Sequence, residues 1–127
     1  MSCTISTSHA LENVWMLRNA MFRWFAERFA EKFCDDAELV HQIEMAVVCN
    51  GVSLDLLYEE NPRLTVRLRD ALRLVASEIA SGKHVVCNDD VPVPDQLRSR
   101  EVFANLVAIL DRAQFKVEGE KGDSFND

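Results

Sequence analysis

Residues 15–33 read WMLRNAMFRWFAERFAEKF and contain six of the ten aromatic residues of the 127-residue chain. Apolar side chains recur there at intervals of three, four and seven residues, which is typical of one buried helical face. We therefore predict a long first helix from about Ser8 to Phe33. On that helix Arg18 lies in the middle of the aromatic stripe. Because a buried, unpaired guanidinium is very costly, we expect Arg18 to reach towards solvent, to stack on Trp15 or to meet a carboxylate.

The apolar face of this helix is broad. Trp24 and Leu17 stand about 100–120° away from the main stripe when positions are projected at the helical repeat. One interpretation is a central helix that neighbours contact from two sides, and this is the favoured one. The other is that Trp24 and Leu17 remain exposed and form a homodimer or partner surface.

Caps, glycines and apolar stripes predict four further helices. They are a helix between an Asp35 or Asp36 cap and Asn50-Gly51, a short helix from Ser53 to Tyr58, a regular helix from Asn61-Pro62 to Ser81-Gly82, and a last helix from about Asp95 or Ser99 to Lys116. Between the last two, Pro92 and Pro94 exclude a helix and predict an irregular connector over residues 83–95. The expected fold is an all-α, single-domain bundle of four main helices plus the short one, over residues 1–116. A disordered polar tail is expected at 117–127.

Composition limits the classes of protein. The net charge of −7 argues against general binding to nucleic acid or to an anionic membrane, since both need clustered positive charge. The longest apolar runs, Met45–Cys49 and Leu106–Leu110, are five residues each, whereas a membrane span needs about 20. The first ten residues show no signal-peptide pattern. The spacing of the four cysteines does not resemble a disulfide framework, so a reducing, cytoplasmic environment is expected.

Sequence signatures of catalysis are weak. The four cysteines are scattered, without the spacing of a disulfide framework or a zinc site, and the four glycines form no phosphate-binding loop. No G-x-S-x-G nucleophile elbow exists. We therefore expect no enzyme activity, no catalytic residue, no cofactor and no resident metal.

Two weaker patterns have the residue types of metal or cysteine sites. Glu38 and His41 form an E-x-x-H pair, but a di-iron bundle needs two such pairs and two more glutamates. The pair also falls opposite the apolar stripe of its helix, which predicts a solvated face. His84 and Cys87 lie in the connector next to two aspartates, which would raise a thiol pKa. A structural connector is favoured there, with a metal or cysteine site as the alternative.

The helix predicted over residues 62–81 carries the local positive charge of this acidic chain. Residues 62–82 hold four basic and two acidic side chains, and the segments on both sides are net negative. The basic residues are Arg63, Arg67, Arg69 and Arg73. Like-charged pairs four residues apart cost an isolated helix roughly 0.2–0.5 kcal/mol each. We expect acidic groups to offset this, either Asp70 with Asp55, Glu59 or Glu60 of the same chain, or an acidic partner surface or dimer mate.

Residues 57–79 resemble the core of RbcX, the Rubisco-assembly chaperone family. The resemblance rests on Leu57-Tyr58, Glu60, Pro62, Leu64, Arg67-Leu68, Ala76 and Glu78-Ile79. It implies a small, helical, dimeric and non-enzymatic protein that clamps an extended client peptide. The chain lacks the family's proline pair followed by tryptophan, and Pro92 and Pro94 interrupt the helix that should follow. For these reasons we do not assign the chain to the family.

The sequence thus favours a non-enzymatic, small, acidic, helical protein-interaction module of the adaptor, inhibitor, immunity-factor or assembly-chaperone type. Its expected partner is another protein, with a homodimer also open and nucleic acid and membrane disfavoured. The candidate partner-binding residues are Arg63, Arg67, Arg69, Arg73, Trp24 and Leu17. The first alternative is a helical DNA-binding regulator that uses the arginine face of helix 62–81, and the second is a metal or cysteine site at His84 and Cys87.

Overall fold

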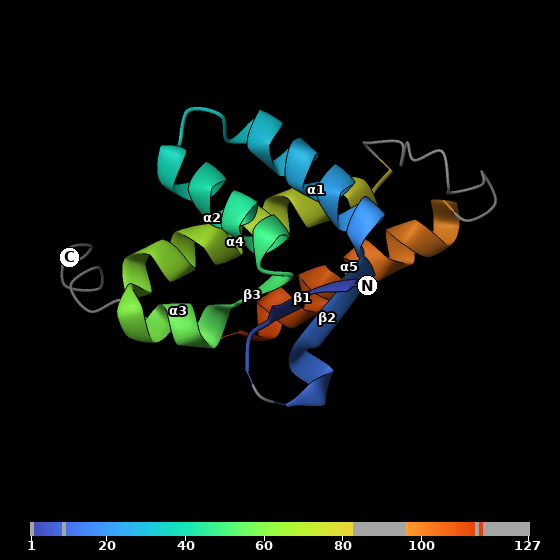
Figure 1. The fold of residues 1–127 in the computed structure, drawn as a ribbon. Coiled ribbons are helices and arrows are strands. Elements are labelled where there is room, and N and C mark those ends of the chain that lie inside the picture. Colours follow the sequence, from blue (N-terminus) through green and yellow to red (C-terminus); the bar gives the residue numbers. More distant parts are fainter. Residues whose placement is uncertain (1, 9, 83–95, 114, 116–127) are drawn as a thin grey trace, which may run out of the picture.

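The computed structural model describes residues 2–8, 10–82, 96–113 and 115, and Figure 1 shows its fold. Five α-helices, a single 3₁₀ turn (η1) and three short strands make up this part of the chain. Their order is β1 (Ser2–Ser6), η1 (Leu11–Asn13), β2 (Val14–Arg18), α1 (Asn19–Lys32), α2 (Ala37–Val48), β3 (Gly51–Ser53), α3 (Leu54–Glu60), α4 (Pro62–Ala80) and α5 (Gln96–Arg112). The prediction of an all-α bundle is wrong, because the strands form a mixed sheet.

The sheet has the strand order β2-β1-β3. β1 and β2 are antiparallel, with Ser6 opposite Val14 and Ser2 opposite Arg18. β3 runs parallel to β1, with Thr4 opposite Gly51. The sheet therefore joins two segments that are far apart in the sequence, namely β1 and the link between α2 and α3.

Side chains along the strands alternate between the core and the outer face. Cys3 and Ile5 of β1 and Trp15 of β2 are buried, whereas Thr4 is half-buried and Met16 is exposed. This period of two is the signature of a strand with one buried face. The predicted first helix from Ser8 is wrong for this reason, and α1 begins only at Asn19.

The start of α1 also changes the environment of Arg18. This residue ends β2 and precedes the helix with extended backbone angles, φ −60° and ψ 150°. Its side chain is exposed. The expectation that Arg18 lies in the aromatic stripe is therefore wrong, because the strand points it away from the core.

The predicted helix boundaries after α1 are close to those observed, except that α5 ends at Arg112 and not at Lys116. Asp36 caps α2, with its carboxylate accepting a hydrogen bond from the Leu39 N–H at 3.2 Å. Asn61 caps α4 in the same way, and Pro62 occupies the first turn. Asn50, with a φ of 66°, reverses the chain after α2. Residues 83–95 and 117–127, predicted to be a connector and a tail, lie outside the described residues.

The helices pack in two groups beside the sheet. One is the α1–α2 hairpin, and the other is α4 with its neighbours α3 and α5. In Figure 1, α1 and α2 form a hairpin that lies over α4, and α5 passes behind the sheet. The most extensive contact between two helices joins α4 and α5. Within the described residues, no helix combines the length and apolar character needed to cross a membrane.

Four aromatic rings at the centre connect the sheet to these helices. We call Trp15, Trp24, Phe25 and Phe103 the aromatic cluster. Phe103 of α5 has its ring centroid 5.4 Å from that of Trp15, 5.3 Å from that of Phe25 and 6.3 Å from that of Trp24. The Trp15 indole N–H also donates to the Val102 carbonyl at 2.9 Å.

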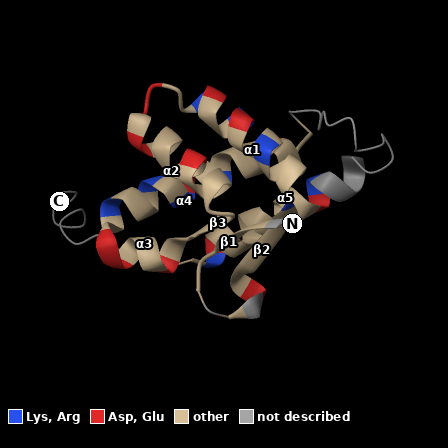
Figure 2. Ribbon diagram, viewed as in Figure 1, with Lys and Arg blue, Asp and Glu red and all other residues tan. Residues whose placement is uncertain are grey.

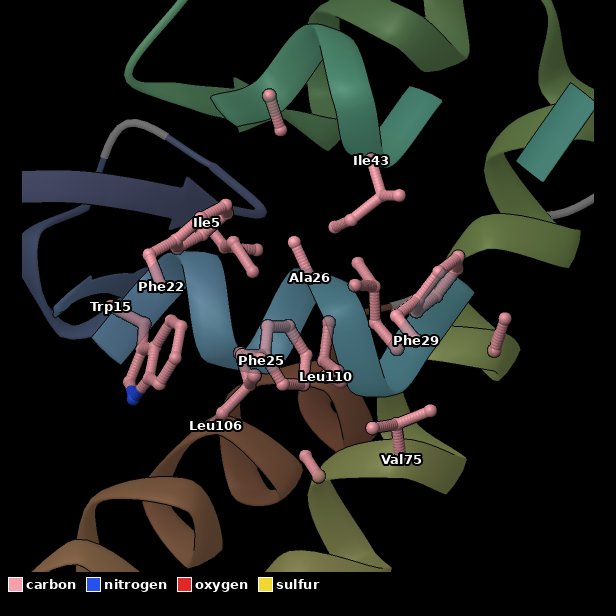
Figure 3. Close-up of a cluster of buried hydrophobic side chains, with 14 of the residues drawn as sticks. Ile5, Trp15, Phe22, Phe25, Ala26, Phe29, Ile43, Val75, Leu106 and Leu110 are labelled. Atoms are coloured by element: carbon pink, nitrogen blue, oxygen red, sulfur yellow. The ribbon is translucent and has the colours of Figure 1, made fainter. Parts of the chain in front are cut away.

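A wider layer of aliphatic side chains surrounds the aromatic cluster. Figure 3 shows Ala26 of α1 facing Ile43 of α2, while Phe25 lies against Leu106 and Leu110 of α5. All of these residues are buried. One helix, α1, therefore contacts neighbours on two sides, but Leu17, which was expected on the same broad face, lies on β2 instead.

Gly51 provides a test of the β1–β3 junction. Its φ is +139°, and a Cβ added there would lie 2.2 Å from the Thr4 carbonyl oxygen. We expect Gly51→Ala to lower the free energy of unfolding by about 3 kcal/mol or more, measured by urea denaturation.

Gly82→Ala is the matched control. Gly82 also has a positive φ, +85°, but its added Cβ would meet the flexible end of the Arg100 side chain at 2.9 Å. Since that side chain can move, a loss of about 1–2 kcal/mol is expected. Equal losses for the two variants would contradict the close approach of Gly51 to β1.

Candidate functional site

Arg67 of α4 is bound by two acidic residues at the start of α2. Its Nη1 lies 2.7 Å from Glu38 Oε1, and its Nη2 forms a second ion pair with Asp36. The Asp36 carboxylate thus both caps α2 and accepts from Arg67. The hydrogen bond from Arg67 is the main cause that lowers the pKa of Asp36, and hydrogen bonds from Arg67 to Glu38 and Asp36 raise the pKa of Arg67.

Arg69 and Arg73 connect α4 to the end of α5. The Arg69 Nε and Nη2 atoms donate to Asp70 at 3.0 and 2.9 Å, and its Nη1 donates to the Ala113 carbonyl at 3.2 Å. Arg73 forms an ion pair with Asp111, and the hydrogen bond from Arg73 lowers the pKa of Asp111. Three arginines of the predicted site therefore bind groups of their own chain.

The fourth arginine differs from the others. Arg63 is exposed near the start of α4 and forms no ion pair within the described part of the chain. Of the acidic partners predicted from the sequence, Asp70 is found. Asp36, Glu38 and Asp111 were not foreseen, because their approach depends on how α2 and α5 pack against α4. Figure 2 shows the basic residues of α4 in blue beside acidic residues of α2.

Trp24 and Leu17, the second predicted surface, do not lie on one helix. Trp24 is on α1 and only 6% exposed, and the Arg28 guanidinium carbon stands 5.7 Å from its ring centroid. Leu17 is on β2 and half-buried against the core. The two side chains are therefore largely engaged within the chain, and Trp24 presents almost no surface to a partner.

Some of the cysteine and metal candidates lie within the described residues, and others lie outside them. Cys3 is buried, its thiol donates to Asn19 Oδ1 at 3.2 Å, and burial raises the pKa of that thiol. Among the described residues, no group of three or more His, Cys, Asp or Glu side chains is arranged to hold a metal ion. Glu38 pairs with Arg67, and His41 is exposed. His84 and Cys87 lie outside the described residues.

The surface has an apolar hollow between α1 and α2, which we call the α1–α2 groove. It has a volume of about 380 Å³ and is lined by Arg23, Ala26, Glu27, Ala30, Ile43, Glu44, Val47 and Val48. Val48 is 76% exposed, the largest exposure of any large hydrophobic side chain in the described chain. The small residues Ala26 and Ala30 leave the space, and Arg23, Glu27 and Glu44 supply the charges.

A second hollow lies between the sheet and the last helix, and we call it the β2–α5 cleft. Its volume is about 320 Å³, and it is lined by Glu12, Val14, Trp15, Met16, Asn105, Ala108, Ile109 and Arg112. The Arg112 side chain donates to the Glu12 carbonyl at 2.7 Å and so holds η1 against α5. One wall of this cleft is the outer edge of β2, which pairs with no other strand in the described part of the chain.

Sequence reasoning did not identify either hollow. A signal for the first was present: the apolar run Met45–Cys49 is too continuous for one helix face to bury. In the structure Met45 and Val48 are exposed as a result. The second hollow gave no such signal, because it requires β2 and α5 to meet.

Comparison with protein-family models, with curated proteins and with solved structures gives no match to this chain.

The interaction of Arg67 with Asp36 predicts a pH dependence. The folded-state pKa of Asp36 is lowered, so its stabilising contribution is present above the unfolded pKa of about 4 and is lost as the pH falls through the folded value. In Arg67→Gln, an NMR titration should find the pKa of Asp36 raised towards its ordinary value. Because the folded and unfolded pKa values of Asp36 then nearly coincide, the acid-side fall in stability should be smaller than in the unmodified protein.

Arg63→Gln is the control for this titration, since it removes a neighbouring exposed arginine from the same helix. It should leave the Asp36 titration close to that of the unmodified protein. If Arg67→Gln also leaves the pKa of Asp36 unchanged, Arg67 does not hold this carboxylate in solution.

Proposed function

We propose that this protein is a non-enzymatic protein-interaction module that binds a partner protein in the α1–α2 groove. The observation that supports this most is an apolar groove whose lip residue, Val48, is 76% exposed. Concave apolar surfaces of this kind are the usual binding sites of soluble proteins.

The shape of the groove favours a short helical segment as its occupant. The groove follows α1 from Arg23 to Ala30, a length of about 10 Å at the helical rise. Two packed helices with small residues between them can accept the apolar face of a third helix, with side chains one turn apart as anchors. One to two turns of a partner helix match this length.

The charge around the groove favours a basic partner. Residues 19–48 contain three basic and six acidic side chains, and the charged residues that border the groove itself are Arg23, Glu27 and Glu44. Complementary charges at the rim of an interface raise the association rate and select partners. The proposed partner segment therefore carries apolar anchors flanked by lysine or arginine.

The arginines of α4 receive a different role in this proposal. Arg67, Arg69 and Arg73 hold α2, α4 and α5 together, so their charges are largely neutralised within the chain. This weakens the support for a DNA-binding regulator, because phosphate contacts would have to compete with these ion pairs. Of the four arginines, Arg63 keeps an exposed charge free of ion pairs in the described part of the chain.

The proposal is tested with Val48→Lys, which places a charge at the lip of the groove. Affinity capture from the native host identifies the proteins that co-purify, and titration of the purified partner then gives dissociation constants. Val48→Lys should weaken that binding by about tenfold or more. Circular dichroism melting should show little change in stability, because Val48 is already exposed.

Leu56→Lys is the matched control, since Leu56 is a 54% exposed leucine on α3, away from the groove. It should bind the partner as the unmodified protein does. Equal binding by the two variants would contradict the groove as the docking site. A chain that captures no stoichiometric partner would contradict the interaction module itself.

A further inference from the structure

β2 forms one edge of the sheet. The directions in which its backbone N–H and C=O groups point follow from the hydrogen bonding between β1 and β3. The Thr4 N–H donates to the Asn50 carbonyl at 3.1 Å, so the N–H and C=O of Thr4 point towards β3. In a strand, successive residues direct these groups to opposite sides. Ile5 therefore points its groups towards β2 and forms a hydrogen-bonded pair with Trp15.

The same alternation directs the backbone groups of Val14 and Met16 away from β1, towards the open edge. The hydrogen bond from the Thr7 N–H to the Asn13 carbonyl, at 3.0 Å, agrees with this assignment, because it joins odd-numbered residues of the two segments, as the Ile5–Trp15 pair does. Within the described residues, no other element accepts from or donates to the Val14 and Met16 backbone. The Arg18 N–H points the same way.

The surroundings of this edge leave space for another strand. The β2–α5 cleft runs beside it, and the helix wall of that cleft contains the small residue Ala108. Met16, at the middle of the strand, is 61% exposed. An open edge with an exposed apolar side chain is a template for a further strand unless it is covered.

We propose that β2 pairs antiparallel with β2 of a second copy of this chain. A two-fold axis midway between the two Met16 residues relates the two copies. The two sheets then form one continuous sheet of six strands. Met16 exchanges both backbone hydrogen bonds with Met16 of the partner subunit, and Val14 lies opposite Arg18 of the partner subunit. The pairing is self-complementary, because the groups that point outwards on one copy meet the same groups on the other.

The charges at the two ends of β2 favour antiparallel over parallel pairing. They also favour a second copy of this chain as the strand that pairs with the edge. Glu12 precedes β2, Arg18 ends it, and both side chains are exposed. Antiparallel pairing brings the Arg18 end of each copy beside the Glu12 end of the other. Opposite charges across strands are favourable, whereas a parallel pair would place like charges together.

This surface is separate from the α1–α2 groove, whose residues all lie on α1 and α2. Loss of partner binding in the groove and loss of the dimer are therefore distinguishable, since each has its own variants and its own measurement.

Cysteine crosslinking tests the register. In a background with Cys34, Cys49 and Cys87 changed to Ser, Met16→Cys places two thiols at the two-fold axis. The Cα atoms of such a pair are about 5.5 Å apart, within the range of a disulfide. Mild oxidation should convert most of the protein to a covalent dimer.

Val14→Cys in the same background is the control. In the proposed register the two introduced thiols are displaced by about four positions, or about 13 Å along the strands, and cannot form a disulfide. Equal crosslinking of the two variants, or no crosslinking of Met16→Cys, overturns the register.

Sedimentation equilibrium of the unmodified full chain tests the dimer directly. The expected result is a monomer–dimer equilibrium, and a chain that stays monomeric up to about 1 mM overturns the proposal. Met16→Pro removes an outward N–H and should raise the dissociation constant about tenfold or more, because two hydrogen bonds are lost at the axis. An outward N–H on an edge strand can be replaced by proline without breaking the β1–β2 ladder.

Two further variants separate dimerisation from folding. Met16→Lys keeps every backbone group and places like charges opposite each other, so it should also weaken the dimer. Leu17→Pro removes an N–H that faces β1 and should lower the melting temperature instead. A Met16→Lys protein that dimerises as well as the unmodified chain contradicts the proposal.

Discussion

The packing of Phe103 against Trp15, Trp24 and Phe25 is the interaction on which the other elements depend. Phe103 is fully buried and lies on α5, whereas its three neighbours come from β2 and α1. A strand and a helix that follow each other in sequence are thus fixed at an angle by a helix from the other end of the chain. Aromatic rings suit this role, because each buries a large area and prefers tilted contacts.

This arrangement explains where the surface features lie. Because α1 is covered from one side by α5 and from the other by α2, its small residues Ala26 and Ala30 leave a groove beside α2. β2 packs its inner face on α5, and among the described residues no further strand pairs with its outer edge. The two proposed interaction surfaces are therefore consequences of the way one aromatic cluster is shared among three elements.

The sequence predicted the parts of the fold that depend on local signals. Asp36 and Asn61 cap helices where they were expected, and α4 follows its regular apolar stripe. The strands were missed because each has only three to five residues and β1 pairs with a segment far along the chain. The spacing between Trp15 and the aromatic residues that follow it suits a helix as well as the position of Trp15 suits a strand. The partners of Arg67 and Arg73 depend on packing between helices, which spacing along one helix cannot reveal.

A double-mutant cycle between Trp15 and Phe103 tests the central claim most directly. Unfolding free energies of Trp15→Leu, Phe103→Leu and the double variant should give a coupling energy of about 0.5–1.5 kcal/mol. A second cycle pairs Trp15→Leu with Phe33→Leu, at the far end of α1, where Phe33 stacks on Phe29. That cycle should be additive within about 0.5 kcal/mol. If the Trp15–Phe103 cycle is also additive, β2 and α5 are not joined through these rings and the arrangement of the sheet against the helices is wrong.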